Sequence, residues 1–130
     1  MPVKPQTQSQ PQPQNDIQIK YGLVLVKSSE KYSTYQVVYR KEFDLKEMVR
    51  ELREFAIVNR AVVRIINVYA VDSIHSVSLT ILPSGILRLS IMMGFRTGVA
   101  VPNAVDILPE ELSTLKTLVE KAIEITQNMF

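Results

Sequence analysis

Cysteine and tryptophan are absent from this 130-residue sequence, and histidine occurs once, at position 75. The absence of cysteine excludes disulfide bonds, thiolate metal sites and a cysteine nucleophile. A single histidine cannot build a transition-metal site without a second histidine or a cysteine. We therefore expect a protein that holds no metal and no cofactor.

Glycine is scarce as well, with four residues at positions 22, 85, 94 and 98, and their spacing matches no phosphate-binding loop. No serine lies in the G-x-S-x-G elbow of a hydrolase. Asp72 and His75 are close enough in sequence for an acid–base pair, but a histidine in a surface turn is the simpler interpretation. We expect no catalytic residues and therefore no enzyme.

Long hydrophobic runs are also missing. Every apolar run ends well short of the roughly 18 residues that a membrane-spanning helix needs. The N-terminus carries one lysine and no apolar core, unlike a secretory signal peptide. These features predict a soluble cytoplasmic protein that does not bind membranes. The main charges are Lys, Arg and Glu, and Ile, Val and Leu dominate the apolar residues, a combination that is common in heat-adapted proteins.

Residues 1–15, MPVKPQTQSQPQPQN, are rich in proline and glutamine and have almost no apolar side chains. Such a segment buries too little surface to offset the entropy lost on ordering, so we predict a disordered tail. An inert solubilising tail and a partner-docking arm are both compatible with this composition. Residues 16–130 are long enough to form a single domain with its own core.

Alternation of apolar and polar residues predicts two β-hairpins. The first joins residues 17–28 to residues 33–43 around the polar turn SSEK. The second spans residues 75–95 around Pro83, Ser84 and Gly85. Between them, residues 61–71 are apolar at nearly every position, which is typical of a central strand, although they could instead prolong the preceding helix.

Two helices complete the prediction. Asp44 and Glu47 form a capping-box variant that opens a helix with apolar residues at helical spacing, and Asn59 is a plausible end. The last helix begins at Pro109. Residues 98–107 between the second hairpin and this helix are predicted as a loop, with a short edge strand at 99–101 that Pro102 would end.

The resulting order is β-β-α-β-β-β-α. We therefore predict an α+β fold, a two-layer sandwich in which an antiparallel-rich sheet of about five strands carries two helices on one face. The other face of such a sheet must meet water or a partner. In the second hairpin this face carries Ser78, Thr80, Arg88 and Ser90.

The net charge of +2 conceals an asymmetry. Residues 59–105 carry four arginines against one aspartate, whereas residues 106–130 carry five acidic residues against two lysines. Basic strands with interleaved tyrosines supply phosphate contacts and rings on which bases can stack. We therefore predict a non-enzymatic module that binds single-stranded DNA or RNA on the uncovered face. The candidate residues are Lys20, Arg40, Arg64, Tyr69, Arg88 and Arg96. For Tyr35 and Tyr39, which share a face with Val37 and Phe43, a core position is the favoured interpretation.

The apolar residues of the last helix cover more than the one stripe that packing on a sheet requires. A second copy of the chain could cover the surplus, with Leu118 and Ile125 at the seam of a homodimer. The alternative function is a protein-interaction or assembly subunit that uses this helix and the open sheet face.

Overall fold

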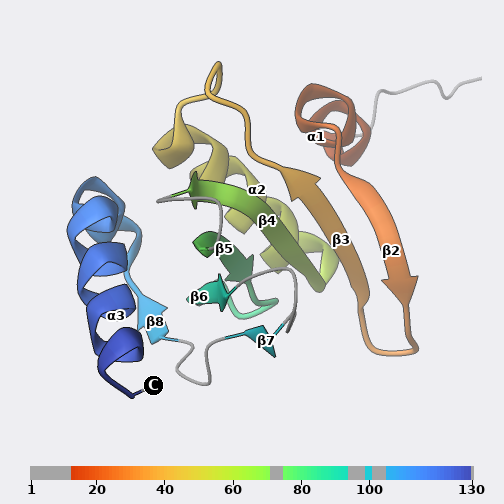
Figure 1. Ribbon diagram of the computed structural model, residues 1–130. Helices are drawn as coiled ribbons and strands as arrows, with labels where there is room; N and C mark the ends of the chain where they lie inside the picture. The colour runs from red at the N-terminus through yellow and green to blue at the C-terminus, as the bar shows by residue number, and fades with distance from the viewer. Residues whose placement is uncertain (1–12, 71–74, 94–98, 101–104, 130) are drawn as a thin grey trace, which may run out of the picture.

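One mixed sheet of seven strands carries the fold, with the helices packed on one side of it (Figure 1). The computed structural model describes residues 13–70, 75–93, 99–100 and 105–129. The elements are α1 (Pro13–Tyr21), β2 (Val24–Ser28), β3 (Ser33–Val38), α2 (Leu45–Asn59), β4 (Ala61–Ala70), β5 (His75–Ile81), β6 (Leu87–Met93), β7 (Val99–Ala100), β8 (Val105–Ile107), the 3-10 helix η1 (Pro109–Thr114) and α3 (Leu115–Met129).

The strand order is β2-β3-β4-β5-β6-β7, and β8 also pairs with β6. All neighbouring strands are antiparallel except β3 and β4, which are parallel and are connected through α2. The predicted α+β sandwich, its antiparallel-rich sheet and its two main helices are therefore confirmed. The sheet has two strands more than the five predicted, and α1 is an additional helix.

Residues 17–21 are helical, and the strand predicted over residues 17–28 begins only at Val24. Its partner, predicted over residues 33–43, ends at Val38. Apolar residues that alternate with polar ones cannot all lie on one face of a helix. The apolar side chain of Ile19 is therefore left 81% exposed in α1. Residues 13–15 of the predicted tail belong to α1, and the rest of that prediction lies outside the described residues.

Contacts with α2 explain why α1 forms in spite of its sequence pattern. Tyr21 is buried, packs edge-on against Phe43 with ring centroids 5.0 Å apart, and donates its hydroxyl hydrogen bond to Glu51. Lys20 Nζ lies 2.9 Å from the same carboxylate. The hydrogen bond from Tyr21 is the main reason that the pKa of Glu51 is lowered. Gly22 then leaves the helix with a φ of 72°.

The expected boundaries of α2 are confirmed, with one change in the cap. Asp44 accepts hydrogen bonds from the backbone N–H groups of Lys46 and Glu47 at 3.0 and 3.5 Å. Glu47 does not complete a capping box, because its carboxylate accepts hydrogen bonds from Arg50. The helix ends at Asn59, and the left-handed residue that terminates it is Arg60, with a φ of 50°.

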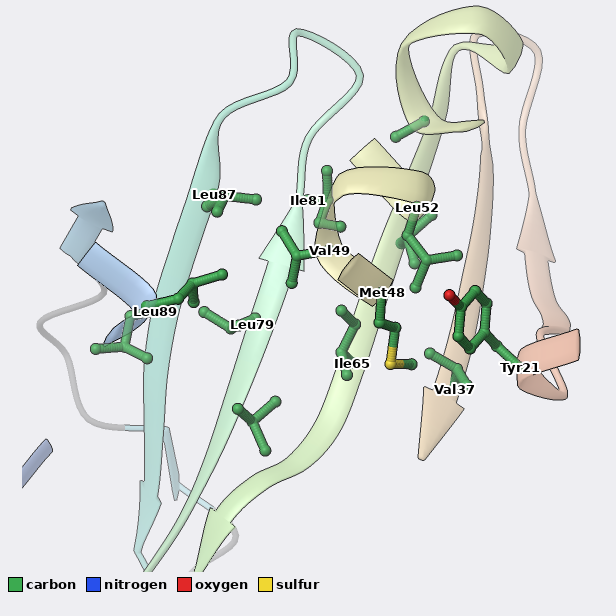
Figure 2. Close-up of a cluster of buried hydrophobic side chains, with 14 of the residues drawn as sticks. Tyr21, Val37, Met48, Val49, Leu52, Ile65, Leu79, Ile81, Leu87 and Leu89 are labelled. Carbon is green, nitrogen blue, oxygen red and sulfur yellow. The ribbon is translucent and has the colours of Figure 1, made fainter. Parts of the chain in front are cut away.

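The strand interpretation of residues 61–71 is confirmed, since β4 occupies Ala61–Ala70 between β3 and β5. Its residues Ala61, Val63 and Ile65 are fully buried and face α2 together with Leu79 of β5. Figure 2 shows how Met48, Val49 and Leu52 of α2 lie against these strands. Leu112, Leu115 and Val119 of η1 and α3 join the same core cluster, so these helices cover the same face as α2.

The second hairpin is confirmed as β5 and β6, which pair in register from His75↔Met93 to Ile81↔Leu87. The short edge strand is present as β7, and Val101 and Pro102 lie outside the described residues. Residues Val105–Ile107, predicted as loop, form β8. Ile107 is buried there and pairs with Leu87, a long-range contact that local alternation over three residues cannot reveal.

The two turn glycines provide a matched test of backbone strain and crowding. Both have positive φ, so alanine at either position should cost about 1 kcal/mol for its left-handed backbone. At Gly22 an added Cβ meets nothing within 4 Å, whereas at Gly85 it would lie 2.9 Å from Ile57 Cδ1. We expect Gly85→Ala to lower the free energy of unfolding by about 0.5 kcal/mol more than Gly22→Ala, because the exposed Ile57 side chain must shift from its rotamer; urea denaturation measures both losses. Equal losses would contradict the packing of this turn against α2.

Candidate nucleic-acid interface

One register row of polar residues crosses the helix-free face of the sheet. From β3 to β8 the row consists of Gln36, Arg64, Thr80, Arg88 and Asp106. Arg64 lies between the buried residues Val63 and Ile65, so the period-two geometry of the strand directs it to the opposite face. Arg88 lies between Leu87 and Leu89 and faces the same way. The structure thus brings Arg64 and Arg88 into the same row, with Thr80 between them, two strands and about 10 Å apart.

Arg88 forms an ion pair with the last member of the row. Its Nε donates to Oδ1 of Asp106 at 2.8 Å, and a second guanidinium nitrogen lies 3.4 Å from Oδ2. This hydrogen bonding lowers the pKa of Asp106 and raises the pKa of Arg88. The side chains are 42% and 49% exposed, so solvent screens the pair and a phosphate could compete with the carboxylate for Arg88.

Hydroxyl groups lie beside the two arginines. Thr80 stands between Arg64 and Arg88, and Ser78 is opposite Ser90 in the neighbouring row. The polar side of the hairpin therefore belongs to the helix-free face. Ser78 is nevertheless only 2% exposed, and its Oγ has no hydrogen-bond partner among the described residues. The helix-free face is therefore covered at Ser78, next to the register shift between Ile65 and Tyr69.

Lys27 is a third cation on this face, and sequence reasoning missed it. Strict alternation from Leu25 would direct Lys27 toward the helices. The irregularity between Leu25 and Lys27 changes the register, so that Leu25 pairs with Tyr35 and Lys27 pairs with Thr34. Thr34 belongs to the helix-free face because it pairs with Val62, a neighbour of Arg64 in β4. A bulge in an edge strand has no clear sequence signal here.

The other predicted interface residues are not in this row. Lys20 belongs to α1 and bonds to Glu51 on the helix side. Arg40 follows β3, is 67% exposed and lies 3.8 Å from Glu42. Tyr69 packs against the core, and Arg96 lies outside the described residues.

The tyrosines of the first hairpin also pack into the core. Tyr35 meets Phe55 edge-on with ring centroids 5.3 Å apart. Tyr39 packs against the core cluster and donates its hydroxyl to the backbone oxygen of Phe43 at 3.0 Å. The core interpretation of these residues is therefore the one that the structure supports. The row itself offers guanidinium and hydroxyl groups and no aromatic ring.

The two proposed dimer residues have different environments. Leu118 is partly buried and packs against the protein's own core, while the side chain of Ile125 is outside the described part. The α3 dimer stays a prediction.

Two hollows lie on the helix side, away from the row. One of about 530 Å³ is bounded by α2 and η1, and one of about 480 Å³ by α1 and α2. Within the described ranges, no group of three or more His, Cys, Asp and Glu residues is arranged to hold a metal ion. The pair Asp72 and His75 cannot be placed, because Asp72 and the side chain of His75 fall outside the described residues. In the same part of the chain, none of the helices combines the length and the apolar character needed to cross a membrane.

Comparison with protein-family models, with curated proteins and with solved structures finds no match to this chain. Its function has to be argued from the surface itself, since a fold class alone does not specify one.

The ion pair between Arg88 and Asp106 predicts a titration that can be measured directly. We expect Asp106 to titrate below the ordinary aspartate range, because Arg88 stabilises its charged form. Arg88→Gln should raise the pKa of Asp106 toward the ordinary value, as followed by carboxyl-carbon NMR. Arg40→Gln, which removes an equal charge near Glu42, should leave Asp106 unchanged. An Asp106 pKa insensitive to Arg88→Gln would show that the pair does not form in solution.

Proposed function

We propose that this protein is a non-enzymatic cytoplasmic module that binds single-stranded nucleic acid on the helix-free face of its sheet. The observation that supports this is the common register row of Arg64 and Arg88, with Lys27 on the same face. The helices in the described structure pack on the other face, and Arg64, Thr80 and Arg88 are each partly exposed. Open sheet faces receive single strands in several unrelated RNA-binding folds.

The binding mode follows from the groups present. Guanidinium forks pair with phosphate oxygens in two-point geometry, and Thr80 between them can donate a further hydrogen bond. Because the row has no aromatic ring, stacking contributes little and the backbone dominates recognition. Binding should therefore be independent of sequence and should fall as salt rises. Three cations predict a slope of log K against log salt of about −2 for a single strand.

Exposed apolar residues on the same face favour a second candidate function, a protein-interaction subunit. Val24 and Val38 are 58% and 45% exposed and flank Gln36 on the helix-free side of β2 and β3. A protein partner would bury these side chains and would show little dependence on salt. Salt dependence therefore distinguishes the two candidates.

Substitution of Arg64 tests the location of the proposed site. Arg64→Glu should weaken binding of labelled oligo(dT) and oligo(U) by at least about tenfold, because a phosphate contact is replaced by repulsion. Arg40→Glu makes the same charge change away from the row and should bind like the wild type. Fluorescence anisotropy at two salt concentrations measures both effects, and circular dichroism confirms the fold. Equal losses in the two variants, or a flat salt response, would contradict the proposal.

Removal of the competing carboxylate should have the opposite effect. Asp106→Asn releases Arg88 from its ion pair and should tighten oligonucleotide binding by about three- to tenfold at low salt. Asp16→Asn, which adds the same net charge on α1, should change affinity much less. If both variants bind equally tightly, only overall charge matters and the row is not the site.

A further inference from the structure

The middle of the polar row offers hydrogen-bond donors from three neighbouring strands. Thr80 of β5 pairs with Arg64 of β4 on one side and with Arg88 of β6 on the other. Its neighbours Leu79 and Ile81 are buried in the core, so the Thr80 side chain lies on the helix-free face. Neighbouring strands are about 4.8 Å apart, and arginine side chains are long. Both guanidinium groups can therefore reach an anion that lies over Thr80.

Arg88 keeps donors for such an anion although it is paired with Asp106. The carboxylate of Asp106 accepts hydrogen bonds from Nε and Nη2 of Arg88. An arginine has five N–H donors in a planar fork, so about three of them remain for another acceptor. The pair therefore restrains Arg88 without using all of its donors.

A phosphomonoester matches this set of groups better than a phosphodiester does. The phosphate at the end of a strand carries a charge of about −1.5 to −2 at pH 7 and has three terminal oxygens. A phosphodiester inside the strand has a single charge and one terminal oxygen fewer. Two guanidinium groups and one hydroxyl can bond to all the terminal oxygens of the monoester, and its charge then balances both arginines.

The charges on either side of these three residues also favour the end of a strand over its middle. On the β8 side the next residue in the row is Asp106, whose carboxylate repels phosphate. On the β2 side Lys27 is exposed on the same face. A strand whose last phosphate lies over Thr80 can extend toward Lys27 and avoid Asp106. An internal phosphate in the same place would force the chain past the carboxylate.

We propose that Arg64, Thr80 and Arg88 form a subsite for the terminal phosphate of a single strand, with the rest of the strand running toward β2. The inference rests on the proposed function and adds the class of substrate, which is strand ends that carry a phosphomonoester. Strands that end in a hydroxyl group bind on the same face more weakly.

Oligonucleotides that differ only at one end test this subsite. Oligo(dT) with a terminal phosphate, at the 5′ or the 3′ end, should bind about tenfold more tightly than a hydroxyl-ended oligomer one nucleotide longer. That gain is expected from an additional charge-assisted hydrogen bond. The longer oligomer has the same number of phosphate groups and therefore controls for phosphate count. Competition against a labelled hydroxyl-ended oligomer measures these affinities without a label near the phosphate.

Acidification should reduce the preference for the phosphorylated end. A phosphomonoester takes up its second proton with a pKa of about 6, so the ratio of the two affinities should fall between about pH 7.5 and about pH 5. The pairing of Arg88 with Asp106 lowers the pKa of Asp106 and raises the pKa of Arg88, and an arginine such as Arg64 does not lose its proton in proteins. The charges around the phosphate therefore stay constant, and a ratio that does not change with pH would contradict the subsite.

Substitution of the hydroxyl group provides a matched pair of variants. Thr80→Val keeps the β-branched shape and removes the donor, so it should reduce the preference for the phosphorylated end by about fivefold. Thr34→Val makes the same change on the same face, beside Lys27, and should retain the full preference. An equal preference in the two variants would exclude Thr80 from the subsite and overturn the inference.

The outcomes separate this inference from the proposed function. If phosphate-ended and hydroxyl-ended oligomers bind with the same salt-dependent affinity, the terminal subsite is wrong and binding on the open face stands. If no oligomer binds, or if affinity does not depend on salt, the proposed function itself fails and the subsite fails with it.

Discussion

The packing of α2 against β4 and β5 decides what every other surface of this protein can do. The helix side chains in this contact are Met48, Val49 and Leu52, which pack on Ile65 and Leu79 of the sheet. This packing determines which face of the sheet is covered. Because strand side chains alternate, the same contact directs Arg64 to the open face. A register shift of one residue in β4 would turn its buried side chains to the open face. The same shift would bury the guanidinium group of Arg64 away from water. The row of polar residues on the open face is therefore a consequence of the core.

Sequence reasoning succeeded where local periodicity and long-range packing agree. Both hairpins, α2 and the central strand follow from alternation, helical spacing and the Asp44 cap, and all are present. The position of Arg88 was predictable for the same reason, since Leu87 and Leu89 on either side must enter the core. The failures occur where a distant partner overrides the local pattern. Residues 17–21 alternate like a strand, yet Glu51, some thirty residues away, holds Tyr21 and Lys20 in a helix.

The predicted interface was too broad for a related reason. Alternation indicates which residues share a face of one strand, but it does not reveal which face the rest of the chain covers or where the register changes. Tyr69 therefore entered the list although it packs against the core, and Lys27 was left out although the irregularity in β2 turns it to the open face. The open face retains two of the proposed cations, Arg64 and Arg88, and none of the proposed rings. This difference changes the expected recognition from base stacking to phosphate contacts.

The polar row has a direction across the open face. Lys27 lies on this face at the β2 end of the sheet, Arg64 and Arg88 follow in β4 and β6, and Asp106 in β8 carries the negative charge. A nucleic-acid strand on this face would therefore meet cations along most of its path and would be repelled at the β8 end.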